Sequence, residues 1–289
     1  MDGSNRTCQP ASKEEPSTGG VPRVTALMTV YNGAAFIRRA VDSMLGQTLK
    51  DIEVLVVDDG STDNTVEILQ AIKDNRMRII RLPRTGRAAA LAIAAREARG
   101  RYIANLDADD VSYPERLEKQ AAFLDANPDY GWVGCGEEQD DNRRAEHLFR
   151  KYPLTDAEMR NQSAKCVPYT HSAVMFRKSV IDEGINYDPK QPFLIDFEFF
   201  LRVAERYKVA NLQEVLVKRY IRAESYFQSN FKTSRQNVRL VYLCASSVWR
   251  FKLSPWRYVF PLARFAYPYV PNAVKQMIRN NQGLGERHV

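Results

Sequence analysis

Short apolar runs and amphipathic segments alternate along the first 130 residues of the chain. The apolar runs are rich in β-branched residues and predict strands at 24–31, 52–57, 77–82 and 102–106. Helical spacing of apolar positions predicts helices at 36–45, 66–72, 88–98 and 116–125. The run at 52–57 is almost continuously apolar, which is typical of a strand buried on both faces. This alternation predicts an α/β fold with a mostly parallel, doubly wound sheet.

The pattern becomes less regular beyond residue 131. Short strands are expected at 132–135 and 173–176, a helix at 197–207 and an extended segment at 209–220. A long helical segment is expected to start near residue 229. These elements extend the sheet predicted for the first part of the chain.

The two ends of the chain differ in composition from its middle. Residues 1–22 are polar, rich in Ser, Pro, Gly and charge, and lack the apolar segment of a signal peptide. They predict a disordered leader. We expect a main domain over 23–225, with halves at 23–130 and 131–225, and a helical extension over 226–289.

Composition and charge indicate the cellular compartment of the protein. The 289 residues carry a net charge of +7, and Lys and Arg outnumber Asp and Glu from Arg202 onward. Four cysteines lie far apart, which predicts free thiols in a reducing compartment and neither a disulfide framework nor a zinc site: Cys8, Cys135, Cys166 and Cys244. No run reaches the roughly 18 uninterrupted apolar residues of a membrane span. We therefore expect a cytoplasmic protein.

Two groups of carboxylates follow two of the predicted strands. Asp58 and Asp59 come after the second strand, and the run Asp107-Ala108-Asp109-Asp110 comes after the fourth. The carboxyl ends of parallel strands are where ligands bind, so these acids are expected to share one edge of the sheet. A divalent cation carrying a diphosphate would neutralise them. The alternatives are a well-formed turn at Asp-Gly-Ser-Thr-Asp and surface acids in a loop.

The motifs around these acids resemble one protein family. They are VTALMTVYNGAAFIRRAVDSMLGQT, IEVLVVDDGSTDNT, GRYIANLDADDVSYPERLEKQ, THSAVMFRKSVI and IDFEFFLRVAERY, in this order over roughly two-thirds of the chain. They resemble the family 2 glycosyltransferases of the GT-A fold, and DADD followed by PERLEKQ is the most specific part. The resemblance implies inverting transfer from a nucleotide-diphosphate sugar to an acceptor hydroxyl of a glycan or lipid-linked glycan. Cell-surface polysaccharide, lipopolysaccharide and glycoprotein glycans are the implied products.

The resemblance also assigns roles to residues on the donor side, in the half 23–130. Asp59 is expected to contact the nucleotide base, and Asp107 and Asp109 to bind Mn²⁺ or Mg²⁺, with Asp110 supporting their loop. Other residues expected on the donor side are Thr29, Tyr31, Asp58 and Gly86. A UDP-sugar is the commonest donor in the family.

On the acceptor side, in the half 131–225, the resemblance assigns the general base to Asp196. A base is needed because the acceptor hydroxyl must lose its proton as it attacks the anomeric carbon. The alternative for Asp196 is an ordinary helix N-cap. Glu198 is the next candidate base, and Arg202 belongs to the same motif. His171, in Thr-His-Ser, is expected to contact the diphosphate, a metal or the acceptor, or to be a structural histidine.

The chain departs from the family pattern at several positions. Thr29 stands where Pro is usual, and Ile195 replaces the Glu of a Glu-Asp pair. Ala92 and Asn105 also differ, and the stretch Arg219-Tyr220-Ile221-Arg222 lacks the usual His. The donor-binding acids are present, so a protein that binds a donor without turnover stays open as an alternative.

Three other classes share parts of this pattern. A sugar-phosphate nucleotidyltransferase would need a Gly-rich, basic loop after the first strand, where Tyr31-Asn32-Gly33-Ala34-Ala35 stands. A dinucleotide-binding dehydrogenase would need G-x-G-x-x-G at the same place. A receiver-like signalling module would leave the D-x-D motif and Asp196 unexplained.

The segment 249–277 combines aromatic residues, basic residues and prolines. Such a segment can lie in a membrane interface, with its aromatic rings at head-group depth and its cations toward anionic lipid. The alternative is a pair of helices packed on the main domain and broken by prolines. Nucleic-acid binding is not expected, because no recognition motif accompanies the basic residues.

Overall fold

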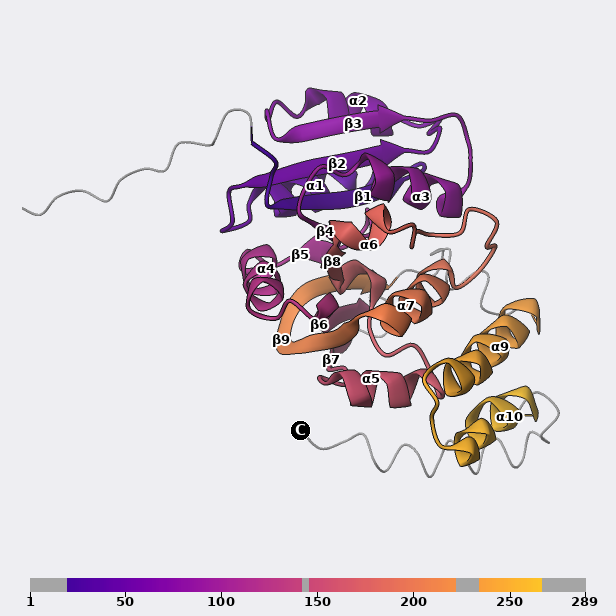
Figure 1. Cartoon of the computed structure of the whole chain (residues 1–289). Coiled ribbons are helices and arrows are strands. Elements are labelled where there is room, and N and C mark those ends of the chain that lie inside the picture. Colours follow the sequence, from indigo (N-terminus) through magenta and orange to yellow (C-terminus); the bar gives the residue numbers. More distant parts are fainter. Residues whose placement is uncertain (1–19, 142–145, 222–233, 267–289) are drawn as a thin grey trace, which may run out of the picture.

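The computed structural model describes residues 20–141, 146–221 and 234–266 (Figure 1). Almost all of the predicted leader at 1–22 lies outside these ranges, as do residues 267–289 of the predicted extension. The described residues form a mixed α/β fold in which helices cover both faces of one sheet.

The first half of the chain alternates strands and helices, as the hydrophobic pattern predicts. The strands are β1 (Val24–Val30), β2 (Ile52–Asp58), β3 (Met77–Arg81) and β4 (Tyr102–Asn105). The helices are α1 (Ile37–Leu45), α2 (Thr65–Ala71), α3 (Arg87–Glu97) and α4 (Arg116–Ala126). Each of the eight elements agrees with its predicted position to within two residues.

The remaining strands are more numerous than the sequence predicts. They are β5 (Val111–Ser112), β6 (Tyr130–Asp141), β7 (Glu146–Arg150), β8 (Met175–Arg177) and β9 (Lys208–Ile221). The helices are α5 (Asp156–Ser163), the 3-10 helix η1 (His171–Ala173), α6 (Lys178–Asp182) and α7 (Ile195–Arg206). The strand predicted at 173–176 therefore begins two residues late, because His171–Ala173 form a 3-10 turn.

All nine strands belong to one sheet with the order β3-β2-β1-β4-β8-β6-β9-β5, and β7 pairs with β6. The pairs among β1, β2, β3 and β4 are parallel, and so is the long pair of β6 and β9. Strand β8 joins the two parallel groups by running antiparallel to β4 and to β6. The sheet is therefore mostly parallel and continues without interruption across residue 130.

The core lies on both faces of this sheet. Leu27 of β1 belongs to the cluster beneath α3, α6 and α7, whereas its neighbours Ala26 and Met28 belong to the cluster beneath α1 and α4. Trp132 is fully buried at the centre of the first cluster. Its ring centroid lies 5.0–6.0 Å from those of four other aromatic side chains: Tyr169, Phe176, Phe199 and Phe200. This aromatic group fixes α7 against the sheet.

The C-terminal helices stand beside this domain, at the lower right of Figure 1. They are α9 (Ser234–Arg250), the 3-10 helix η2 (Pro255–Tyr258) and α10 (Val259–Ala266). Helix α9 packs on α5 and α7 through buried residues that include Leu240, Leu243 and Val248, and α10 packs on α9. No helix in the described part of the chain combines the length and the hydropathy that a membrane span requires.

Candidate active site

The parallel strands bring the predicted donor residues to one edge of the sheet. Val30, at the end of β1, pairs with Asp58, at the end of β2. Leu27 of the same strand pairs with Asn105 of β4, so the chain leaves β4 and enters Asp107 beside these ends. Thr29, just before the end of β1, is half-buried and pairs with Val57.

Asp59 is buried and is already saturated with hydrogen bonds. Its carboxylate accepts from the backbone N–H of Thr85 at 2.7 Å, from the Thr85 hydroxyl at 2.7 Å and from the N–H of Gly86 at 3.0 Å. The Arg84 guanidinium forms an ion pair with the same carboxylate. Asp59 thus holds the loop between β3 and α3 against the carboxyl end of β2.

Two glycines give these loops backbone conformations that other residues rarely adopt. Gly60 has a φ of +77°, and a Cβ there would lie 2.8 Å from the backbone nitrogen of Arg84. Gly86 has a φ of +92° and is the N-cap of α3. An L side chain is strained in both conformations, so both positions require glycine. Asp58, two residues before Gly60, is buried, and its carboxylate accepts from the N–H of Ser61 at 3.2 Å.

Tyr31 offers an exposed aromatic face beside this loop. Its side chain is 43% exposed, and the Arg84 guanidinium lies 3.6 Å from the centroid of its ring. Because Arg84 also pairs with Asp59, the ring, the cation and the buried acid form one unit at the end of β1.

The D-x-D loop is paired with a cation that the sequence did not point to. Arg87, in the first turn of α3, donates to Asp107 Oδ1 at 2.8 Å. Burial raises the pKa of Asp107, but Arg87 and His171 outweigh it and hold that pKa well below its usual range. In return Asp107, and further Asp196 and Asp109, raise the pKa of Arg87. Asp107 is therefore a charged carboxylate.

His171 connects this loop to the buried polar layer beneath it. Its Nδ1 lies 3.4 Å from Asp107 Oδ1, and its Nε2 lies 3.0 Å from Asn105 Nδ2 and 3.1 Å from the Tyr187 hydroxyl. Because Asn105 Nδ2 can only donate, Nε2 accepts, and Nδ1 carries the hydrogen that faces Asp107. His171 is thus buried against Asp107, in reach of a group that binds there.

Asp110 anchors the loop from below. Its carboxylate accepts from the Ser172 hydroxyl and from the N–H of Tyr220 at 3.2 Å, and Arg219 lies 3.7 Å away. Burial raises the pKa of Asp110 to about 8, against the opposing charge of Arg219. Arg219 also donates to the buried carboxylate of Glu137 at 3.2 Å. Arg219 belongs to the stretch at 219–222, which lacks the family's usual His. This stretch therefore places a positive charge beneath the D-x-D loop.

Arg116, in the PERLEKQ motif, is fully buried under the same loop. It donates to the carbonyl oxygen of Asn105 at 2.7 Å and to that of Val174 at 3.2 Å, and to the side chain of Gln120 at 3.0 Å. Burial lowers the pKa of Arg116 to about 10. Arg116 of the PERLEKQ motif thus connects the end of β4 to the end of η1 through these hydrogen bonds.

Asp196 lies in the first turn of α7. The N-cap of this helix is Leu194, in the left-handed region with a φ of 53°, so the alternative that Asp196 is an N-cap is wrong. The charge of Asp196 raises the pKa of Arg87 and, after burial, the pKa values of Tyr169 and Tyr187. The Tyr169 hydroxyl is buried and makes no regular hydrogen bond within the described residues. Asp196 is half-buried between these groups.

Glu198 points elsewhere. It forms an ion pair with Arg202 at 2.8 Å, one turn further along α7, and Arg202 also donates to the carbonyl oxygen of Asn186. Ile195, which stands where the family has Glu, is buried in the core. The charges of Asp107, Asp109 and Asp196 thus all act on Arg87, whereas Glu198 and Arg202 form a separate ion pair.

The described ranges hold no group of three or more His, Cys, Asp or Glu side chains arranged to bind a metal ion by themselves. The two D-x-D carboxylates still fit a divalent cation. Mg²⁺ in phosphate-binding sites is commonly held by one or two carboxylates together with the phosphates of the substrate. Asp107 is charged and partly exposed, and Asp109 is half-buried beside it. Both can serve as oxygen ligands.

Sequence reasoning missed Arg87, Arg116 and Glu137. A basic residue in the first turn of a helix is unfavourable with the helix dipole. The position of Arg87 could therefore have indicated that it has an acidic partner. Glu137 lies two residues beyond the strand predicted at 132–135, so the pattern gave no reason to expect a buried acid there. Arg116 carried no such signal.

Comparisons with known proteins identify the family of this chain. The family model for glycosyl transferase family 2 matches residues 25–185, more than half of the chain. EpsE of Bacillus subtilis (strain 168) is 30% identical over 278 residues, which cover 91% of this chain and 97% of EpsE. The chain belongs to glycosyl transferase family 2, and it is a glycosyltransferase. The nucleotidyltransferase, dehydrogenase and receiver alternatives are thereby excluded.

Two solved structures share the fold. TarS 1-349 of S. aureus, in complex with UDP-GlcNAc, has a TM-score of 0.66 at 21% identity, and the match covers 84% of this chain and 71% of that chain. The mannosyltransferase PcManGT from Pyrobaculum calidifontis, in complex with GDP-Man and Mn²⁺, has a TM-score of 0.61 at 19% identity, with coverages of 93% and 82%. The predicted GT-A fold is confirmed.

Proposed function

We propose that this glycosyltransferase transfers a sugar, with inversion, from a nucleotide-diphosphate donor to a hydroxyl of a glycan or lipid-linked glycan. The observation that carries this proposal is the meeting of the D-x-D loop and the first turn of α7 at one cation. Arg87 is ion-paired with Asp107, and its pKa is raised by Asp107, Asp196 and Asp109. A site that must hold a diphosphate and deprotonate an acceptor needs these groups within one substrate length.

The donor side follows from the carboxyl edge of the sheet. Asp107 and Asp109 would hold Mn²⁺ or Mg²⁺, and the ion would neutralise the charge that develops on the leaving diphosphate. The bound GDP-Man and Mn²⁺ of PcManGT and the bound UDP-GlcNAc of TarS support a donor of this chemical class. A UDP-sugar is the first candidate.

The nucleotide side is formed by Tyr31 and the loop that Asp59 holds. Tyr31 presents an exposed ring, and Arg84 lies against it, so a base and ribose have an aromatic and a cationic surface to contact. Because Asp59 already accepts from Thr85 and Gly86, we assign it first to positioning this loop. Direct contact of Asp59 with the base would require one of these hydrogen bonds to exchange.

The acceptor side centres on Asp196. It accepts the proton of the acceptor hydroxyl as that oxygen attacks the anomeric carbon. The new carbon–oxygen bond forms while the bond to the diphosphate breaks, and the nucleoside diphosphate leaves on the opposite face. A single displacement inverts the anomeric centre. The ion pair of Glu198 with Arg202 makes Glu198 a poor second choice for the base.

The test replaces Asp196 by Asn in the full chain. Sugar transfer should fall by about 10²–10⁴, the usual contribution of a general base, while titration with UDP, GDP and dTDP in Mn²⁺ should still detect binding of the same nucleotide. Glu198→Gln is the matched control and should keep most of the transfer activity. Normal turnover by Asp196→Asn would refute the base assignment. Nucleotide binding without transfer by the unsubstituted protein would favour the donor-binding protein that lacks turnover.

A further inference from the structure

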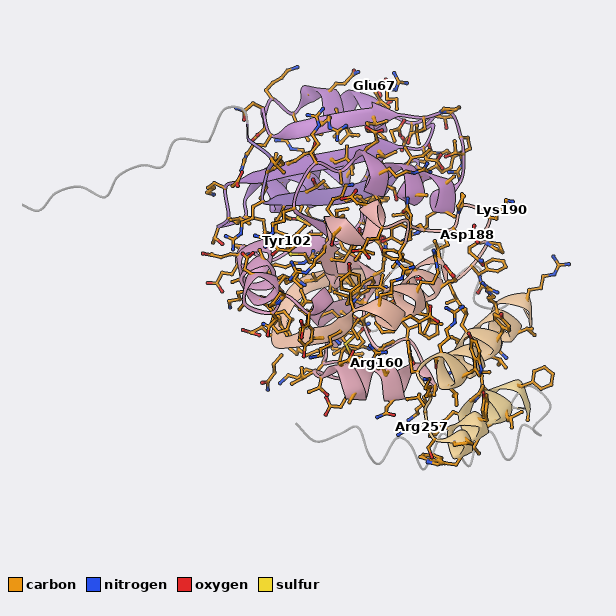
Figure 2. All side chains as sticks on the ribbon, viewed as in Figure 1. Glu67, Tyr102, Arg160, Asp188, Lys190 and Arg257 are labelled. Atoms are coloured by element: carbon orange, nitrogen blue, oxygen red, sulfur yellow. The ribbon has the colours of Figure 1, made fainter. Side chains whose placement is uncertain are left out.

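The C-terminal part of the chain has an unusual charge pattern. No Asp or Glu occurs over residues 225–285, although this stretch contains nine Lys and Arg residues. In the described helices, Arg250 is paired with Glu205 at 3.0 Å. Arg257, labelled in Figure 2, donates to the carbonyl oxygen of Asn161 at 3.5 Å. A carbonyl does not neutralise a guanidinium, so the region presents a positive potential that nothing in its own sequence offsets.

Helix α9 in this region has two apolar faces. One face is buried on the main domain through residues that include Leu240, Leu243 and Val248. The other is exposed and carries Val238, Tyr242 and Trp249, which follow the spacing of a single helical stripe. Trp249 is 75% exposed, an exposure that is rare for tryptophan in a soluble domain.

The next two elements continue the exposed apolar surface. Trp256 of η2 is 58% exposed, and Val259, Leu262 and Phe265 of α10 are 50–64% exposed. Their spacing of three residues places the side chains of α10 toward one side of that helix. We call the exposed apolar residues of α9, η2 and α10 the outer face: Val238, Tyr242, Trp249, Trp256, Val259, Leu262 and Phe265.

We propose that the outer face docks on a bilayer surface that contains anionic phospholipids. Aromatic and aliphatic side chains of this kind enter the boundary between head groups and acyl chains, and nearby Lys and Arg bind the lipid phosphates. Two exposed cations lie in this region: Arg235 in the first turn of α9, and Lys252 in the turn that connects α9 to η2. An anionic lipid surface is the partner that would bind both the exposed apolar side chains and the positive charges. Nucleic acid would leave Val259 and Leu262 without a role, and a second copy would bring two positive surfaces together.

Docking in this way would hold the catalytic domain at the membrane without a spanning segment. Helices α9 and α10 lie at one side of the molecule, beyond α5 and α7, so the sheet and its carboxyl edge stay clear of them (Figure 1). An acceptor carried on a lipid would then meet the site from the same surface.

The first test is co-sedimentation of the full chain with vesicles of phosphatidylcholine alone or mixed with phosphatidylglycerol. Binding is expected for the mixed vesicles and should weaken as salt is added. Replacing Trp256 and Leu262 together by Ser should lower the partition coefficient at least about tenfold. Replacing Arg235 and Lys252 by Gln should lower it about fivefold for each charge. Phe149→Ser is the control, because Phe149 is 67% exposed on β7, away from the outer face.

Tryptophan fluorescence supplies an independent readout of the same contact. Trp132 is fully buried, so quenching by brominated phospholipids reports on Trp249 and Trp256. Quenching that disappears in Trp249→Phe/Trp256→Phe supports the docked face. Four results would overturn the proposal: absence of sedimentation with mixed vesicles, equal binding by the Trp256→Ser/Leu262→Ser variant, tighter binding to RNA than to anionic vesicles, or a dimer that buries the two tryptophans.

Discussion

Arg87 links the two acidic parts of the site, the D-x-D loop and the first turn of α7. It neutralises Asp107 directly at 2.8 Å and lies in the field of Asp109 and Asp196. Without it, Asp107 would lose its ion-pair partner, and less positive charge would offset the repulsion among the three carboxylates. The arginine thus lets the acids stay charged and close together before a substrate arrives.

Replacing Arg87 by Gln should therefore have opposite effects on two ligands. The affinity for the nucleotide diphosphate should fall roughly tenfold or more, because a charge-assisted hydrogen bond is lost. The affinity for Mn²⁺ alone should rise, because the cation that competes for Asp107 is gone. Calorimetric titration of each ligand measures both changes, with Arg38→Gln, an exposed i,i+4 pair on α1, as the control. Unchanged affinity for both ligands would show that Arg87 has only a structural role.

At the scale of residues, the sequence revealed the kinds of group in the site but not all their partners. The acids at Asp107, Asp109 and Asp196 were predicted, and in the structure the charges of all three raise the pKa of Arg87. Arg87 and the pair of Arg219 with Glu137 were not predicted, because each partner comes from a different element. The partners of Asp59 were also hidden, since they depend on how closely two loops approach at Gly60.

Helix α4 shows how an element end is fixed by charge. Asp125, near its C-terminus, would be unfavourable there by the helix dipole alone. It pairs with Arg23 at 2.6 Å and Arg101 at 2.9 Å, and accepts from the hydroxyl of Tyr102, a residue labelled in Figure 2, at 2.6 Å. Burial raises the pKa of Asp125, but the hydrogen bonds from Tyr102 and Arg23 outweigh it, so the pKa is lowered.

This lowered pKa predicts a pH dependence of stability. A carboxyl with a depressed folded-state pKa stabilises the protein above its unfolded pKa, about 3.9, and loses that contribution as the pH falls through the folded value. Asp125→Asn should therefore cost roughly 1 kcal/mol at neutral pH, since the group is about a third exposed, and should flatten the decline in stability below about pH 4. Denaturant titrations between pH 3 and pH 7 measure this. Asp129→Asn, at a 71% exposed side chain, should change neither quantity.

The element scale also shows why strand β6 was predicted too short. The hydrophobic pattern ended at Cys135, but the strand continues to Asp141 through buried polar residues such as Glu137 and Gln139. Their hydrogen bonds run to β7 on one side and β9 on the other. Pairing on both sides overrides the low strand propensity of these residues, and such pairing is not visible in local sequence.

For the whole molecule, the alternation of strands and helices was sufficient to predict the parallel half of the sheet. The reversal at β8 was not predictable, because the direction of a short strand depends on partners distant in sequence. The antiparallel β8 joins β4 to β6 and so carries η1 and His171 beneath the D-x-D loop. The position of His171 beneath the loop therefore depends on the direction of β8, which is determined only when the whole sheet is assembled.

Donor binding should stabilise the whole fold. At a nucleotide concentration of about 100 Kd, binding adds roughly 2.7 kcal/mol to the free energy of unfolding. For a domain of this size that corresponds to a rise in Tm of about 5–10 °C. A thermal melt with UDP and Mn²⁺ should show the rise, and a chelator should abolish it. Asp109→Asn should lose the shift, whereas Asp129→Asn should keep it. A rise that persists in the chelator would contradict a role for the metal in donor binding.

Leu194 gives the start of α7 a further property. It is a branched residue with a φ of 53°, in the left-handed region that only Gly, Asn and Asp adopt without much strain. The residues tolerated at this position are therefore determined by the backbone conformation and not by chemical similarity to Leu. Gly or Asn would relieve strain, although both differ greatly from Leu, whereas Val and Ile, its nearest chemical relatives, would raise the strain further. Substitution tables based on hydropathy would rank these four residues in the reverse order.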